Sequence, residues 1–99
     1  MRFEFHPDAL EEYLQAACYY EQQQDGLQHR FIEKVEFTIK QILNDPERYR
    51  LFEEDIRRSL TPFFPYAVLY TIEPKFIHIL AITHCARRPG YWKDRLTDD

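Results

Sequence analysis

The 99 residues suffice for one domain with a single core, here taken as residues 1–99. Hydrophobic and aromatic contents of 44% and 16% indicate a globular rather than a disordered chain. No apolar run is long enough for a membrane span or a signal peptide, which predicts a cytoplasmic protein with no membrane partner. The net charge of −4 is uneven, because residues 1–54 carry 6 basic and 12 acidic side chains whereas residues 55–99 carry 7 and 5. A polyanionic partner would therefore bind the C-terminal half, unless the charges serve only solubility.

The N-terminal half predicts a short strand followed by a helical hairpin. Residues 2–5 alternate polar and apolar side chains, as a half-buried strand does. Pro7 suits the first turn of a helix that extends to about Gln23, with an apolar face at helical spacing. Gly26 can adopt a left-handed conformation in the polar connection, and a second helix follows and ends before Pro46. The first helix is expected to bury one stripe of side chains: Leu10, Tyr13, Leu14, Ala17 and either Tyr20 or Glu21.

The C-terminal half predicts three strands. Residues 45–55 lack periodicity and are expected to form a surface loop. Three β-rich runs with short proline-containing bends between them imply an antiparallel meander: residues 56–61, 66–73 and 76–83. The order β-α-α-β-β-β predicts an α+β domain, in which the helix hairpin packs on one face of a small, mainly antiparallel, twisted sheet.

Neither a metal centre nor a nucleophilic site is indicated. His78 and His84 share a predicted strand and, being an even number of residues apart, one face of it. At ~3.3 Å per residue they lie ~20 Å apart, too far to share a metal. Cys18 lies within a helix and Cys85 at a strand end, and both are expected to be reduced. We expect no metal and no cofactor.

Residues 77–95 carry the strongest functional pattern. An apolar strand ends at His84 and passes directly into a run rich in cations and aromatic residues. Cleavage of RNA through its 2′-hydroxyl needs a base, cations on the phosphorane and an acid for the leaving oxygen. An imidazole and arginines can take these roles, and aromatic rings can stack on bases. Strand alternation sends Arg57 and Arg58 to opposite faces, and the other candidates follow the last strand: Arg87, Arg88, Tyr91, Trp92, Lys93 and Arg95.

The same residues have structural interpretations. A histidine at a strand end is more often a polar terminator than a catalyst. Trp92 is more often a plug at the open end of a core than a stacking platform. Arg87 and Arg88 could bind acidic residues of the N-terminal half or a protein partner. Only their clustering favours a functional site.

Five segments, taken together, resemble the RelE/ParE superfamily, the toxins of bacterial type II toxin–antitoxin systems, also called plasmid stabilization proteins. The resemblance spans nearly the whole chain. The segments are Phe5-His6-Pro7-Asp8-Ala9, the stretch from Asn44 to Tyr49, Ile56-Arg57-Arg58, Phe64-Pro65-Tyr66 leading to Tyr70, and His84-x-x-Arg87-Arg88-Pro89-x-Tyr91-Trp92. The resemblance implies a toxin neutralised by a small cognate antitoxin that wraps it. RelE-like members are endoribonucleases (mRNA interferases) that cut mRNA on the ribosome and so inhibit translation, whereas ParE-like members poison DNA gyrase.

The leading expectation from the resemblance is mRNA cleavage on the ribosome. By position, His84 would transfer protons, Arg58 and Arg87 would stabilise the phosphorane, and Tyr91 would position the substrate or donate a proton. Further binding residues would be Arg57, Arg88, Trp92, Lys93 and Arg95.

One departure from the nuclease pattern concerns the loop before the meander. The best-known RelE-like nucleases carry lysines there, but this loop is acidic, with Glu47, Glu53, Glu54 and Asp55. One of these carboxylates could be the general base, or the acidity could signal weak ribosome affinity. The alternatives are a gyrase inhibitor with no chemistry of its own and an inactive toxin that only binds its antitoxin.

Overall fold

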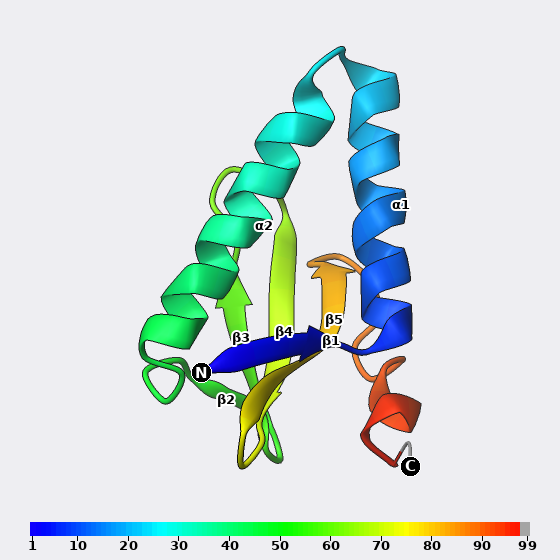
Figure 1. The fold of residues 1–99 in the computed structure, drawn as a ribbon. Helices are drawn as coiled ribbons and strands as arrows, with labels where there is room; N and C mark the ends of the chain where they lie inside the picture. Colours follow the sequence, from blue (N-terminus) through cyan, green and yellow to red (C-terminus); the bar gives the residue numbers. More distant parts are fainter. Residues whose placement is uncertain (98–99) are drawn as a thin grey trace.

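A helical hairpin packs on one face of a five-stranded sheet in the computed structural model, which describes residues 1–97 (Figure 1). The sheet order is β1-β5-β4-β3-β2, with β1 parallel to β5 and the other neighbours antiparallel. The elements are β1 (Arg2–Phe5), α1 (Pro7–Gln23), α2 (Leu27–Asn44), β2 (Leu51–Glu53), β3 (Ile56–Leu60), β4 (Tyr66–Ile72), β5 (Phe76–His84) and the 3-10 helix η1 (Lys93–Thr97). The predicted α+β class and the helix hairpin on one face of the sheet are confirmed.

Local capping explains where the helices begin. The His6 Nδ1 accepts the Asp8 backbone N–H at 3.1 Å, and Pro7 occupies the first helical position, where no N–H is needed. Gly26 is left-handed (φ 85°), as expected, but it caps the start of α2 rather than the end of α1. The Glu21 carboxylate accepts the Gly26 N–H at 3.0 Å and so holds the connection between the helices.

The buried stripe of α1 differs from the predicted one. Leu10 and Leu14 are 42% and 58% exposed, whereas Ala9 and Ala16 face the sheet. Small side chains there allow α1 to lie close to β5, and the larger Tyr13 fills the space toward α2. The prediction for Leu10 and Leu14 was wrong because hydropathy alone favours leucine over alanine at a buried position.

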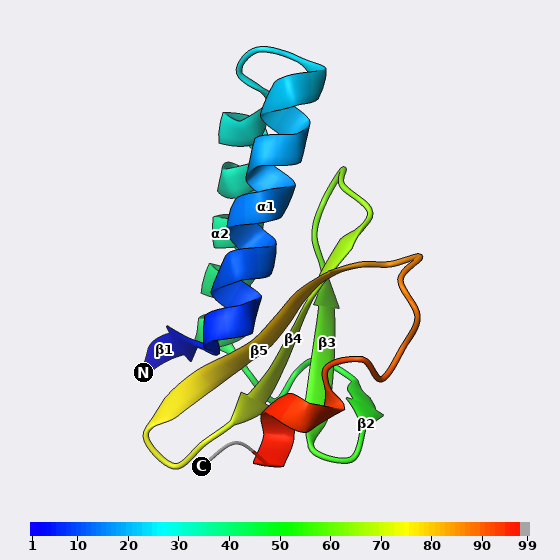
Figure 2. The ribbon, with the colours of Figure 1, turned by 90° about the vertical axis from the view of Figure 1, so that its right-hand side faces the viewer.

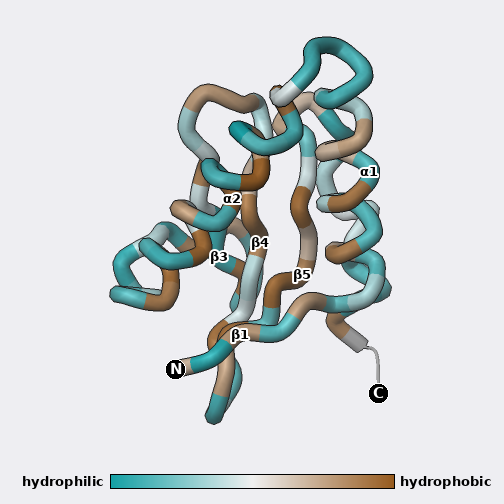
Figure 3. The backbone as a smooth tube through the Cα atoms, turned by 45° about the horizontal axis from the view of Figure 1, so that its top comes forward, coloured by the Kyte–Doolittle hydropathy of each residue, from teal (hydrophilic) through white to brown (hydrophobic). Residues whose placement is uncertain are grey.

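The sheet buries side chains on both faces. The helix face packs residues of α2, such as Phe31 and Val35, against Val68 and Tyr70 of β4. Figure 3 shows the apolar residues concentrated along β4 and β5, with hydrophilic residues over much of the outside of the hairpin. The opposite face has its own cluster, in which Trp92 is 1% exposed and covers Ile56, Ala67, Leu69, Leu80 and Ala81. The C-terminal segment is therefore a second layer of the core (Figure 2).

The segment 45–55, expected to be a loop, contains the short strand β2. Leu51 pairs with Arg57 and Glu53 with Ile56, across an irregularity in register. Glu54 then turns the chain with a positive φ of 50°. A three-residue strand is too short for alternation to distinguish it from a loop.

A β-bulge in β5 overturns the placement of two histidines. Leu69 pairs with Ala81 but Tyr70 pairs with Ile79, so β5 has one extra residue between them. His78 pairs with Thr71 and His84 with Tyr66, and these partners lie on opposite faces of β4. The expectation that both histidines share a face was therefore wrong, because the bulge reverses the alternation.

Candidate functional site

Four ionisable residues among the predicted site residues line one hollow, of about 130 Å³, between β3 and the segment after β5. They are Arg58, His84, Arg87 and Arg88. Phe52 and the buried Trp92 supply apolar walls, and the C-terminal segment that carries the cations runs across the sheet face opposite the helices (Figure 2). The structure thus brings together residues that lie 30 positions apart, through the pairing of β3, β4 and β5.

Arg57 and Arg58 diverge as alternation predicts. Arg58 lies opposite Leu69, on the face of the hollow, and its guanidinium is 4.8 Å from the centre of the Phe52 ring. Arg57 lies opposite Tyr70, on the helix face, and donates to the carbonyl oxygens of Tyr49 at 2.7 Å and Glu47 at 3.3 Å. Arg57 therefore anchors the segment before β2 and lies outside the hollow that contains Arg58.

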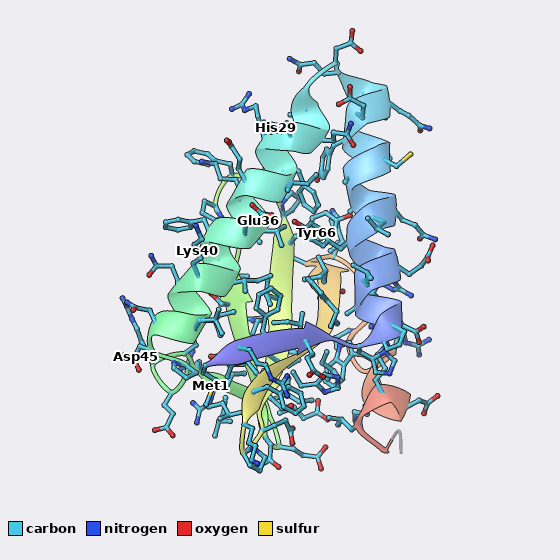
Figure 4. All side chains as sticks on the ribbon, viewed as in Figure 1. Met1, His29, Glu36, Lys40, Asp45 and Tyr66 are labelled. Atoms are coloured by element: carbon cyan, nitrogen blue, oxygen red, sulfur yellow. The ribbon has the colours of Figure 1, made fainter. Side chains whose placement is uncertain are left out.

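His84, the last residue of β5, is exposed and oriented by two contacts. Its Nδ1 accepts the Ala86 backbone N–H at 2.9 Å, and its ring meets the Tyr66 ring edge-on at 5.2 Å. Figure 4 shows Tyr66 in the space between the two helices. In the neutral imidazole an accepting Nδ1 places the proton on Nε2. In this arrangement His84 can donate a hydrogen bond from Nε2, but it could gain a proton and so take part in proton transfer only if Nδ1 gave up the Ala86 bond.

The residue that holds the C-terminal segment is Glu12 of α1, whose role the sequence analysis missed. Its carboxylate accepts the Tyr91 hydroxyl at 2.6 Å and both terminal nitrogens of Arg95, at 3.0 and 2.9 Å. It also accepts the Ile82 backbone N–H at 3.1 Å, and Arg87 Nη1 lies 3.5 Å away. We call Glu12, Tyr91 and Arg95 the Glu12 clasp. It joins the first turns of α1 to the C-terminal segment.

The clasp supplies hydrogen-bond partners for backbone groups on the free edge of β5. β1 pairs with β5 only as far as Ile79, and the next backbone groups on that edge need other partners. The Leu80 carbonyl accepts from Arg95 at 3.0 Å, and the Ile82 N–H donates to Glu12. An ion pair thus replaces a missing strand, with both side chains almost fully covered: Glu12 is 12% and Arg95 11% exposed.

The electrostatics of the clasp make Tyr91 a poor proton donor. Burial and the hydrogen bond to Glu12 raise the pKa of Tyr91 to about 12. Burial alone would lower the pKa of Arg95, but the hydrogen bonds and charge of Glu12 outweigh it and raise that pKa. The Arg87 guanidinium lies 3.6 Å from the centre of the Tyr91 ring and so covers it. Tyr91 and Arg95 hold the segment in place, and Arg87 remains 52% exposed above them.

The other predicted residues have assignable contacts. Trp92 is a core residue, so its ring is not available for stacking on a base. The exposed Lys93 ammonium pairs with Glu53 at 2.8 Å, and this hydrogen bond raises the pKa of Lys93. Three carboxylates proposed as general bases line a separate hollow together with Arg57: Glu47, Glu54 and Asp55.

Three properties of residues 1–97 concern metal ions, thiols and membranes. Within residues 1–97, no group of three or more His, Cys, Asp or Glu side chains is placed to hold a metal ion. Cys18 and Cys85 are both free and exposed. Neither hairpin helix nor η1 is long and apolar enough to cross a membrane.

Comparisons with known proteins identify relatives of this chain. A family model described as "ParE toxin of type II toxin-antitoxin system, parDE" matches residues 3–89. Among solved structures, a chain described as "Chromosomal ParDE TA system from P. aeruginosa" is similar, with a TM-score of 0.72 and 13% sequence identity. The similarity covers 85% of this chain and 95% of that one, and at such low identity it shows the fold alone. No curated protein matches the chain.

Proposed function

Because this chain belongs to the ParE toxin family of type II toxin–antitoxin systems, we propose that it inhibits DNA gyrase by binding, with no chemistry of its own. We further propose a cognate antitoxin as its protein partner, as the "ParDE TA system" of the similar structure suggests. The RelE/ParE resemblance offers two toxic actions, and the arrangement of the candidate site favours the one that needs no proton transfer.

The observation that carries this proposal is that the candidate acids and bases are either already hydrogen-bonded or lie in different hollows. Tyr91 already donates to Glu12, and burial together with that bond raises its pKa to about 12. The acidic residues 47, 54 and 55 line a different hollow from His84. The Nδ1 lone pair of His84 is occupied by the Ala86 N–H. A general base and a general acid on opposite sides of one phosphate are what ribonuclease chemistry would need.

The exposed cations suit a binding surface. Arg58, Arg87 and Arg88 are exposed around the hollow, and rings cover one side of Arg58 and Arg87. Guanidinium groups held over aromatic rings are suited to carboxylate or phosphate contacts, since their donors remain directed outward. Such a surface fits a gyrase–DNA complex, which presents both protein and phosphate.

Ribosome-dependent mRNA cleavage remains the second candidate, on one specific observation. His84 lines one hollow together with three arginines, and such a group of cations is suited to stabilising the charge on a phosphate. This mechanism would need the His84 Nδ1 to release the Ala86 N–H before the imidazole could transfer a proton.

Induced expression without the antitoxin distinguishes the two candidates. We expect DNA damage signalling and gyrase–DNA adducts to appear before translation falls, with messages intact. His84→Gln, whose amide keeps polarity but does not titrate, should retain toxicity, whereas the charge reversal Arg87→Glu should abolish it. Arg2→Glu, far from the hollow and exposed, is the matched control for charge. Killing that persists in a strain with a resistant gyrase, or toxicity lost in a folded His84→Gln protein, would refute the proposal.

A further inference from the structure

The loop between β3 and β4 holds a phenylalanine out into solvent. Phe63 is 86% exposed and its φ is 67°, a left-handed conformation that a bulky side chain rarely adopts. The core does not need this ring, because the next residue, Phe64, packs against Tyr20 at 4.9 Å and Phe31 at 5.2 Å. A strained backbone that presents an apolar ring to solvent is a feature that function, rather than folding, would retain.

Hydrogen bonds hold this loop in one shape. The Thr61 N–H donates to the Tyr66 carbonyl at 2.9 Å, and the Thr61 hydroxyl lies 3.0 Å from the carbonyl oxygens of both Phe64 and Tyr66. The Cys85 N–H donates to the Pro65 carbonyl at 2.8 Å and so ties the loop to the end of β5. A loop fixed in this way loses little conformational entropy on binding, and its exposed ring is therefore pre-organised for contact.

One side of α2 lies next to the exposed ring. The Lys34 Nζ is 5.1 Å from the centre of the Phe63 ring. Arg30 and Phe37 lie on the same side of α2, one turn before and one turn after Lys34, and both are exposed. The ring therefore belongs to a larger surface that combines apolar and basic side chains.

The charges of α2 indicate what this surface would bind. The two carboxylates of the helix, Glu33 and Glu36, lie about 100° or more around its axis from Lys34. The side of α2 next to the loop is thus basic and apolar, although the whole chain has a net charge of −4. Such a surface is complementary to an apolar pocket with an acidic rim.

The loop and the arginines of the candidate site lie at the same end of the sheet. Tyr66, the first residue of β4, pairs with His84, the last residue of β5. Figure 2 shows the β3–β4 loop and the segment after β5 leaving the sheet at this end. A macromolecule that covers this end of the sheet would contact both the exposed ring and the arginines.

We propose that Phe63 is the apolar anchor by which this chain binds gyrase, with its ring in an apolar pocket of the enzyme and Lys34 paired with a carboxylate at the rim. The inference rests on gyrase as the target proposed above and adds the place of contact. Aromatic and basic side chains together are typical of the few residues that dominate a protein–protein interface. Insertion between two DNA bases would need both faces of the ring, and Lys34 lies over one of them.

The test measures inhibition of purified gyrase by toxin variants. Phe63→Asn removes the ring and suits the left-handed backbone, so we expect it to raise the melting temperature by about 2–4 °C. The toxin concentration for half-inhibition of supercoiling should nevertheless rise about 30-fold or more. A variant that is more stable but less inhibitory cannot owe its loss to misfolding. Phe63→Tyr, which keeps the ring, should restore inhibition to within about threefold of the native protein.

Matched variants separate this surface from the rest of the molecule. Lys34→Glu should weaken inhibition about 10-fold, because it would oppose an acidic rim. Lys75→Glu reverses an exposed lysine between β4 and β5, at the other end of the sheet, and should change inhibition less than about threefold. Leu14→Asn is the apolar control for Phe63→Asn, since Leu14 is 58% exposed on α1, and it should also stay within about threefold.

The outcomes distinguish failure of this inference from failure of the proposed function. Full inhibition by Phe63→Asn beside an inhibitory native toxin would overturn this inference alone. A native toxin that does not inhibit gyrase would overturn the proposed function and this inference with it. Binding to gyrase without DNA is the second measurement, and we expect Phe63→Asn to lose affinity there as well.

Three results would assign the ring to another partner and overturn the proposal. A loss that appears only when DNA is present would favour contact with DNA. Weaker binding to the cognate antitoxin, with gyrase inhibition undiminished, would favour the antitoxin. A dimer of the toxin that Phe63→Asn dissociates, again with inhibition undiminished, would favour a second copy of this chain.

Discussion

Neutralising Glu12 should destabilise the whole domain, since one carboxylate joins α1, β5 and the C-terminal segment. In Glu12→Gln the amide can keep one acceptor but loses the charge that balances Arg95, whose other carboxylate contact within residues 1–97 is Asp8 at 3.8 Å. Breaking a buried ion pair from one side costs about 3–5 kcal/mol. Since Asp8 can compensate in part and the shape is kept, we expect a loss of about 1.5–3 kcal/mol of unfolding free energy. For a domain of this size that corresponds to a melting temperature lower by roughly 10–20 °C.

Urea unfolding followed by the fluorescence of Trp92 measures this loss. Trp92 is the only tryptophan and is almost completely buried beside the clasp. The matched control is Glu11→Gln, an exposed neighbour whose carboxylate accepts a hydrogen bond from Gln15 at 3.0 Å, and it should cost less than about 0.5 kcal/mol. A double-mutant cycle of Glu12→Ala with Arg95→Met should give a coupling energy of about 1.5 kcal/mol or more. Equal stability of the Glu11 and Glu12 variants would refute the clasp.

Three further predictions concern other parts of the fold. Trp92→Ala should cost about 3–5 kcal/mol in urea unfolding, because it empties the core of the second sheet face; a loss under 1 kcal/mol would contradict that packing. Arg57→Ala should cost about 1–2 kcal/mol and speed amide exchange in residues 47–50, whereas Arg58→Ala should stay within about 0.5 kcal/mol of the native protein. Alkaline titration, followed by tyrosinate absorbance and circular dichroism, tests the buried tyrosines, whose neutral phenols favour the folded state. Their stabilisation is thus complete below pH 10 and is lost as the pH rises toward 12 through the raised pKa of three tyrosines: Tyr13, Tyr70 and Tyr91. Tyr91→Phe should remove one of these titrating groups, and full ionisation of all tyrosines by pH 10.5 with the fold intact would contradict the assignment.

The sequence was sufficient where local chemistry decides the structure. Pro7 and Gly26 mark the helix boundaries through their own backbone preferences, and alternation correctly separates Arg57 from Arg58. The predicted meander makes β3, β4 and β5 neighbours, and this pairing is what brings Arg58 and the segment after β5 to one hollow.

Long-range contacts account for what the sequence could not supply. Glu12 bonds to residues 79 and 83 positions away, and no local pattern records that pairing. Its spacing from Ala9 and Ala16, three and four residues, places it on the sheet-facing side of α1 and is the one signal that could have indicated it. The bulge at Leu80 has no glycine or proline to mark it, so the faces of His78 and His84 could not be assigned correctly from alternation.

Inhibition of purified gyrase tests the central claim most directly. With purified toxin, gyrase and relaxed plasmid DNA, we predict loss of supercoiling and accumulation of cleaved gyrase–DNA complexes. His84→Gln should be as inhibitory as the native protein, and Arg87→Glu should be inactive although folded. Undiminished supercoiling at saturating toxin, together with new mRNA 5′ ends at a fixed codon position after expression in cells, would contradict the account and make the His84 hollow a nuclease site.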